Sequence, residues 1–252
     1  MVHESAAEGY RQESTTYASA RPSYHPALID RSVDAYGNGT IIDLGAGTGI
    51  FTRQLVERGL QPIAIEPVAE MRAELQASLP GATTLDGTAE HTGLADSSVD
   101  TVFVAQAFHW FDHTQALAEI RRILRPGGHL VCVWNVRDET EPWVQGFTDI
   151  VDRYAGDTPR HRTMEWRRAI DADPAFAIVD DFAVANPVPS SPDAVAARAL
   201  STSFIAALDP AEQRDVLEQI SGLTRPLGPR FEFPYRSELQ AWSRQTIGQS
   251  TA

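Results

Sequence analysis

IIDLGAGTGI, residues 41–50, is the stretch that decides the fold, because a short apolar run reaches an aspartate and then a glycine-rich turn. The apolar run predicts a buried β-strand over 40–44. The residues after the turn predict a helix over 49–59, with Gly59 suited to ending it. A strand, a glycine-rich turn and a helix in this order let backbone N–H groups approach a nucleotide-like ligand.

The spacing of the glycines separates two kinds of ligand. Gly45, Gly47 and Gly49 form G-x-G-x-G, whereas the dinucleotide fingerprint needs a glycine where Ile50 stands. Asp43 comes two residues before the first glycine, and we expect it at the cleft. A carboxylate there would oppose a pyrophosphate and suit a cationic ligand without phosphate, such as S-adenosylmethionine.

Glu66 ends a second predicted strand over 62–66. An acid at this position can accept hydrogen bonds from both hydroxyls of a ribose. NAD-binding and S-adenosylmethionine-binding proteins share this feature, so Glu66 alone does not separate them.

The rest of the chain alternates strand-like and helix-like runs, which indicates an α/β protein with a mostly parallel sheet. Further strands are predicted over 82–86, 99–107 and 129–136, with helices over 68–79 and 112–128. Asp112 is expected to cap the second of these helices. Beyond residue 137 we expect helices near 142–155, 161–171, 192–207 and 210–221, and a strand over 176–184. Residues 230–239 alternate like a final exposed-edge strand, which Pro234 disfavours.

Composition excludes several function classes. The 252 residues carry 34 acidic and 21 basic side chains, a formal net charge of −13 that repels nucleic acid. The single cysteine, Cys132, cannot form an internal disulfide. No secretory signal or membrane span is visible, so we expect a cytoplasmic monomer or homodimer that binds neither nucleic acid nor membrane.

Five segments make the chain resemble the class I S-adenosylmethionine-dependent methyltransferases, in the small-molecule branch with a methyltransferase type 11 core. They are IDLGAGTG, AIEP with Met71, GTAEHTGLADSSVD, VFVAQAFHWFD and EIRRILRPGGHLVCVWN. The resemblance implies a Rossmann-like, seven-stranded, mostly parallel sheet in the order 3-2-1-4-5-7-6. The seventh strand would be antiparallel, with helices on both faces and a helical lid or insertion. It also implies one domain over 1–252, with a lid segment over 1–37, a cofactor-binding core over 38–137 and acceptor-pocket helices and last strands over 138–252.

The same resemblance implies a set of cofactor contacts. The methionine part would lie against Asp43, Gly45, Ala46, Gly47 and Gly49, with Gln106 at its end and Arg21 on its carboxylate. Glu66 would bind the ribose, and Pro67 and Met71 would flank the adenosine. Thr88 stands where many relatives carry the acid that contacts adenine. That contact would then pass to the backbone of Thr88 and Ala89, or to Glu90.

The acceptor is expected beside AQAFHWFD, which follows the fourth strand. His109 has three interpretations: a packed side chain, a polar substrate contact or a general base. Trp110 can donate its indole N–H, and the pair resembles one in carboxyl methyltransferases. Tyr17 and Tyr24 belong to the expected lid. His109 and His113 are spaced like a metal pair, but a strand–helix junction separates them and the resemblance implies no metal.

The favoured hypothesis is methyl transfer from S-adenosylmethionine to a small molecule, with a carboxylate or hydroxyl oxygen as candidate acceptor atom and S-adenosylhomocysteine as product. The alternatives are an NAD-dependent oxidoreductase and a protein of this fold that binds S-adenosylmethionine without methyl transfer.

Overall fold

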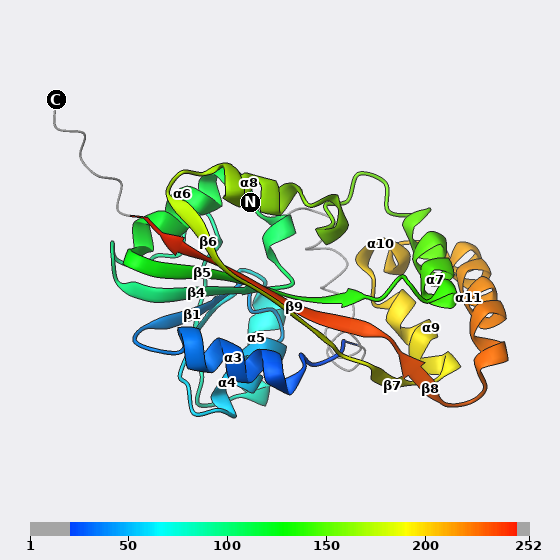
Figure 1. Cartoon of the computed structure of the whole chain (residues 1–252). Helices are drawn as coiled ribbons and strands as arrows, with labels where there is room; N and C mark the ends of the chain where they lie inside the picture. Colours follow the sequence, from blue (N-terminus) through cyan, green and yellow to red (C-terminus); the bar gives the residue numbers. More distant parts are fainter. Residues whose placement is uncertain (1–20, 246–252) are drawn as a thin grey trace.

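A computed structural model describes residues 21–245 and shows one seven-stranded sheet crossed by helices (Figure 1). The strand order is β3-β2-β1-β4-β5-β9-β6, and β9 is antiparallel to both of its neighbours. The strands are β1 (Ile41–Leu44), β2 (Ile63–Ile65), β3 (Thr83–Leu85), β4 (Val99–Ala105), β5 (Leu124–Arg137), β6 (Phe176–Ala185) and β9 (Tyr235–Arg244). Because β9 is the seventh strand of this sheet along the chain, the predicted order and orientation are confirmed.

Helices cover both faces of the sheet. On one face, α3 (Pro26–Tyr36) and α4 (Ile50–Val56) bury apolar side chains against β1, β4, β5 and β9. On the other, α6 (His113–Ile123) and α8 (Glu165–Ala172) pack over a core that includes Trp134 and Trp166. Helix α5 (Ala69–Ser78) lies beside the glycine-rich turn. None of the helices within residues 21–245 has both the length and the apolar character needed to cross a bilayer.

The prediction of an exposed-edge strand over 230–239 is wrong. Pro234 separates β8 (Phe231–Phe233) from β9, so its missing N–H removes no bond from the ladder. Beyond it, Leu239 and Trp242 bury their side chains in the cores on opposite faces of the sheet. Strand β6 forms the edge instead, and β9 occupies the position between β5 and β6.

Helix α6 begins as predicted and ends earlier. The Oδ1 atom of Asp112 accepts a hydrogen bond from the backbone N of Gln115 at 3.0 Å, which confirms the cap. The helix stops at Ile123, and β5 starts at once with Leu124 opposite Val99. Its pairing with β4 shifts register before His129, so the proline–glycine turn lies within an irregularity of β5 rather than at the end of the helix.

A second group of helices lies beyond one end of the sheet, at the right of Figure 1. It consists of α7 (Pro142–Asp152), α9 (Pro192–Leu200), α10 (Ser203–Ala206) and α11 (Pro210–Thr224), with a ribbon of β7 (Val188–Ser190) and β8. These elements share an apolar core of their own. They correspond to the predicted helical insertion. Three short 3₁₀ helices complete the described chain, at Phe108–Trp110, His161–Thr163 and Arg225–Leu227.

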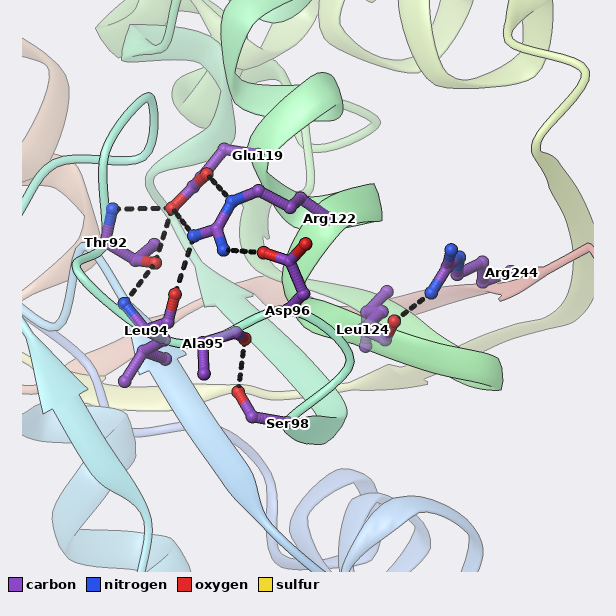
Figure 2. Close-up of polar contacts among 9 residues, drawn as sticks. All are labelled: Thr92, Leu94, Ala95, Asp96, Ser98, Glu119, Arg122, Leu124 and Arg244. Atoms are coloured by element: carbon purple, nitrogen blue, oxygen red, sulfur yellow. Dashed lines mark hydrogen bonds and ion pairs between the residues drawn. The ribbon is translucent and has the colours of Figure 1, made fainter.

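A buried carboxylate ties the segment before β4 to α6 (Figure 2). The Oε1 atom of Glu119 accepts hydrogen bonds from the backbone N of Thr92 at 2.8 Å and from its hydroxyl at 2.6 Å. Arg122 donates to Glu119 at 2.8 Å, to Asp96 at 2.5 Å and to the carbonyl of Leu94 at 2.7 Å. Burial acts to raise the pKa of Glu119, but the hydrogen bonds from Arg122 and Thr92 outweigh it and lower that pKa to about 2.

The substitution Glu119→Gln is expected to lower the free energy of unfolding by about 2 kcal/mol at pH 7, because it removes the charge that Arg122 and Thr92 were arranged to bind. The folded pKa lies below the ordinary value of 4.5, so this contribution is complete above pH 4.5 and is lost as the pH falls through about 2. Urea unfolding of both proteins at pH 7 and pH 3 measures it. A stability difference that does not shrink at pH 3 would contradict the assignment.

Candidate functional site

The turn between β1 and α4 has a backbone that glycine makes possible. Gly47 has φ of 57°, and a Cβ atom there would meet nothing nearer than the Sδ of Met71 at 3.9 Å, so its backbone faces open space. Gly49 has φ of 83°, and a Cβ atom there would lie 2.7 Å from the Cγ of Leu75. The first glycine thus leaves room for a ligand, and the second lets α4 approach α5.

A cavity opens at this turn, along the carboxyl ends of β1, β2 and β4. Eleven residues predicted to bind the cofactor line it: Arg21, Gly45, Ala46, Gly47, Glu66, Pro67, Met71, Thr88, Ala89, Glu90 and Gln106. Tyr24 and Trp110, predicted to contact the acceptor, line the same cavity. Tyr17 lies outside the described residues. We call this space the turn cavity.

Two predicted cofactor residues are placed elsewhere, which corrects the prediction that they lie on the cleft wall. Gly49 packs against α5, and the side chain of Asp43 is completely buried behind the turn. The Oδ2 atom of Asp43 accepts a hydrogen bond from the Thr52 hydroxyl at 2.6 Å, and its Oδ1 has no hydrogen-bond partner in the described part of the chain. Burial, with a smaller contribution from Glu66, raises the pKa of Asp43 to about 7, against the hydrogen bond from Thr52.

Glu66 is held rigidly on the cavity wall. Its Oε2 accepts a hydrogen bond from the backbone N of Gly47, and its Oε1 accepts one from the backbone N of Val68, both at 2.8 Å. Burial raises the pKa of Glu66 despite these two bonds. Each carboxylate oxygen keeps a second lone pair, so the group can still accept hydrogen bonds from two adjacent hydroxyls.

The segment from Thr88 to Glu90 forms a second part of the same wall. Thr88 and His91 form an isolated bridge with backbone bonds of 3.1 and 3.2 Å. The carboxylate of Glu90 accepts a hydrogen bond from the backbone N of Asp112 at 3.1 Å. Burial acts to raise the pKa of Glu90, but this bond and others to its carboxylate lower it overall. The adenine contact predicted for this segment stays a prediction.

Gln106 and Asn135 join the ends of β4 and β5. Gln106 adopts φ of 58°, a left-handed conformation unusual for its residue type, and its Nε2 donates to the carbonyl of Asn135 at 3.0 Å. The Nδ2 of Asn135 donates to the carbonyl of Pro22 at 3.0 Å, and its Oδ1 accepts from the hydroxyl of Ser237 at 2.6 Å. Asn135 therefore fixes the segment before α3 against the sheet. Sequence reasoning missed it, although its place at the carboxyl end of a predicted strand was a usable signal.

A second cavity, which we call the arginine pocket, adjoins the turn cavity. The two cavities share a wall formed by Arg21, Gln106, Trp110, Asn135 and Arg198. Beyond it, the arginine pocket is lined by basic side chains, namely Arg137, Arg160, Arg162, His109 and His161. Sequence reasoning missed Arg137 and Arg198. The available signal was Arg198 itself, a cation among alanine, valine and leucine residues within a predicted helix.

His109 lines the arginine pocket, and its environment does not favour a general base. Burial, reinforced by His161, Arg160 and Arg21, lowers the pKa of His109 to about 3. Its ring lies 4.8 Å from that of Trp110. A general base works best when its pKa is near the operating pH. The low pKa of His109 therefore leaves two of its three interpretations, a packed residue or a substrate contact.

His113, spaced from His109 like a metal ligand in the sequence, packs on an aromatic ring. The ring of His113 stacks on Phe108 at 5.8 Å. Across residues 21–245, no group of three or more histidine, cysteine or acidic side chains is arranged to hold a metal ion.

Comparisons with known proteins agree on one family. A family described as "Methyltransferase domain" matches residues 42–132. An uncharacterized methyltransferase of Mycobacterium tuberculosis is 49% identical over 146 residues, which are 58% of this chain and 59% of that protein. The chain therefore spans less than two thirds of that relative's length. An uncharacterized methyltransferase of Geobacillus kaustophilus is 30% identical over 162 residues, which are 60% of this chain and 73% of that protein.

Solved structures share the fold. A putative type II methyltransferase from Anaeromyxobacter dehalogenans superposes with a TM-score of 0.64 at 24% identity, covering 89% of this chain and 97% of that one. A geranyl diphosphate methyltransferase in complex with SAM gives a TM-score of 0.50 at 18% identity, covering 95% of this chain and 88% of that one.

Proposed function

This chain belongs to the class I methyltransferases, and from that premise we propose that it transfers a methyl group from S-adenosylmethionine to an oxygen of a small-molecule acceptor. The acceptor oxygen belongs to a carboxylate or a hydroxyl group. The observation that carries the proposal is the wall shared by the turn cavity and the arginine pocket. Methyl transfer needs two ligands that meet at one point, and this wall is the place where two adjoining cavities meet.

The turn cavity fits a cofactor without phosphates. The Gly47 N–H already donates to the Glu66 carboxylate, so it is not available to a pyrophosphate. The carboxylate of Glu66 lies on the cavity wall beside the turn, and its negative charge would repel phosphate oxygens. These contacts favour S-adenosylmethionine over NAD, with Glu66 on the ribose hydroxyls and the segment from Thr88 to Glu90 at the adenine.

The protein's main contribution to rate would be positioning. The bound cofactor would supply a methyl group already activated on a sulfonium. The shared wall, with Gln106, Trp110 and Asn135, would hold the acceptor oxygen in line with that methyl group and exclude water. Proximity and orientation of this kind account for ~7–11 kcal/mol of a reaction barrier. A carboxylate acceptor needs no general base at neutral pH, which agrees with the low pKa of His109.

The substitution His109→Gln is expected to keep kcat within about tenfold of the wild type, because a group with a pKa of about 3 removes no proton near neutrality. Both proteins should also show no change in kcat that follows a histidine titration between pH 6 and 8. Initial rates over that range measure this. A loss of kcat beyond a hundredfold, with the acceptor KM unchanged, would restore the general-base interpretation.

The function is tested by incubating the protein with methyl-labelled S-adenosylmethionine and a panel of carboxylic acids, phenols and amines. We expect label in a carboxylic acid or hydroxyl compound, together with S-adenosylhomocysteine. Calorimetry with S-adenosylmethionine and NAD separates the alternatives. Binding of NAD but not of S-adenosylmethionine would overturn the proposal, and cofactor binding with no turnover against any acceptor would favour a protein without methyl transfer.

A further inference from the structure

The arginine pocket carries a charge opposite to that of the whole chain. Its described lining holds five guanidinium groups and one carboxylate, Glu139, although the chain has a formal net charge of −13. Glu139 lies 3.8 Å from Arg162, and Asp152 lies 2.6 Å from Arg160. Both of these acidic side chains are therefore paired with Arg160 or Arg162.

Arg137 and Arg198 are placed differently from Arg160 and Arg162. Within residues 21–245, neither guanidinium forms an ion pair with a carboxylate. Arg137 donates to the hydroxyl of Thr148 at 3.4 Å and lies 4.7 Å from the centre of the Phe147 ring. The Nε of Arg198 donates to the phenol of Tyr235 at 3.1 Å. Aromatic rings and hydroxyls thus contact both cations, and Asp152, whose charge acts on Arg137, is already paired with Arg160.

Arg198 is the stronger evidence for a ligand. Its side chain is only 8% exposed, and its Nη1 atom has no hydrogen-bond partner in the described structure. Burial, followed by the nearby charges of Arg21 and Arg137, lowers the pKa of Arg198 to about 10. Burying a guanidinium beside like charges is costly unless an anion is bound there during function.

The two arginines differ in the cavities that they line. Arg198 lines both cavities, whereas Arg137 lines only the arginine pocket. A group held between them therefore lies on the arginine-pocket side of the shared wall, to which Arg198 itself belongs. An oxyanion whose charge is neutralised by two guanidinium groups is a weak nucleophile, so a different group of the same molecule would meet the methyl donor.

We propose that the acceptor has two polar ends, with a carboxylate or phosphate anchored between Arg137 and Arg198 and a separate oxygen presented at the shared wall. This inference rests on the proposed function and narrows it to anionic acceptors with two polar groups. The anchor's chemistry is that of an oxyanion, which a guanidinium fork binds through two parallel hydrogen bonds.

Titration calorimetry of the full chain, saturated with S-adenosylhomocysteine, tests the anchor directly. The probes are succinate, inorganic phosphate and the uncharged succinamide. We expect succinate or phosphate to bind with a dissociation constant of about 1 mM or tighter, and succinamide not to bind. The anion that binds more tightly shows whether the anchored group is a carboxylate or a phosphate. Saturation with S-adenosylhomocysteine is needed because its carboxylate then occupies the cationic site of the cofactor, where an anionic probe could otherwise bind.

Variants place the anchor. Arg137→Gln and Arg198→Gln should each weaken binding of the better anion at least tenfold. Arg153→Gln, at an exposed arginine directly after α7, should change it less than twofold. Arg137→Gln should also leave the affinity for S-adenosylhomocysteine within twofold, because Arg137 does not line the turn cavity. The Arg137→Gln variant still tests the anchor if Arg198→Gln fails to fold.

Three results would overturn the inference: neither anion binds the wild-type chain, succinamide binds as well as succinate, or Arg137→Gln leaves anion binding unchanged. Failure of S-adenosylhomocysteine to bind counts against the proposed function alone. The anion titrations are therefore also run without S-adenosylhomocysteine, and the same three results would overturn the inference there.

Discussion

Asp43→Asn is expected to make the ligand-free protein more stable at pH 8 and, at the same time, to weaken S-adenosylmethionine binding at least tenfold. The folded pKa of Asp43, about 7, lies above its ordinary value of 3.8 because the carboxylate is completely buried. The folded state therefore binds a proton that the unfolded state has lost, and stability falls as the pH rises from 3.8 to 7. Above pH 7 the loss is complete, at ~4 kcal/mol as an upper limit.

Asparagine abolishes this titration. Its amide can still accept the Thr52 hydroxyl bond, but it leaves an N–H group where the Oδ1 of Asp43 had no partner in the described chain. Such a group costs about 1–3 kcal/mol, so a net gain of about 1–3 kcal/mol remains at pH 8 and becomes a net loss of about 1–3 kcal/mol near pH 4, where the wild-type carboxyl is protonated. Urea unfolding at both pH values measures the gain, with the exposed Asp34→Asn as a matched control.

Cofactor affinity should change in the opposite direction. A cation in the turn cavity favours the ionised form of Asp43, so the wild-type affinity for S-adenosylmethionine should rise with pH up to about 7, the folded pKa of that group. The variant should lack both the affinity and this pH dependence. Equal affinity of the two proteins at pH 8 would show that the carboxylate behind the turn does not act on the ligand.

Glu66→Gln should have the largest effect on binding, with a loss of at least a hundredfold in affinity for S-adenosylhomocysteine. The wild-type carboxylate accepts bonds from the N–H groups of Gly47 and Val68 at 2.8 Å each. A glutamine has one oxygen and one NH₂ group, so it must direct a donor at one of these donors. The turn loses its anchor, and the ribose hydroxyls lose a charged, bidentate acceptor worth about 2–3 kcal/mol.

Calorimetry with S-adenosylhomocysteine and urea unfolding together test the Glu66 prediction. Glu70→Gln, an exposed acid in the first turn of α5, is the matched control and should behave like the wild type. If Glu66→Gln unfolds more easily and yet binds S-adenosylhomocysteine normally, the carboxylate is a support for the turn and not a ligand contact.

Most of the lining of the turn cavity could be predicted from the sequence because its parts are local. A strand, a glycine turn and a helix specify their own geometry, and Glu66 follows from the next strand. Asp43 shows the limit of this reasoning, because its closeness to the glycines in sequence did not tell which way its side chain lies. The structure buries all four residues of β1, so the carboxylate faces the Thr52 hydroxyl instead of the cavity.

The arginine pocket could not be predicted, since no local pattern brings its residues together. Arg137 ends β5, Arg198 lies on α9, and Tyr235 begins β9, so their approach depends on how the helical insertion packs. The same dependence explains the error over 230–239. Alternation there predicted one exposed face, but β9 is inserted between two strands and packs on both sides.

The separate apolar core of α7, α9, α10 and α11 has an evolutionary consequence. Substitutions in that core can reshape the far side of the arginine pocket without repacking the strands that carry the glycine turn. Two selective pressures, one to keep the methyl donor and one to change its recipient, then act on different sets of side chains. A lineage with this architecture can exchange recipients in small steps while its donor site stays intact.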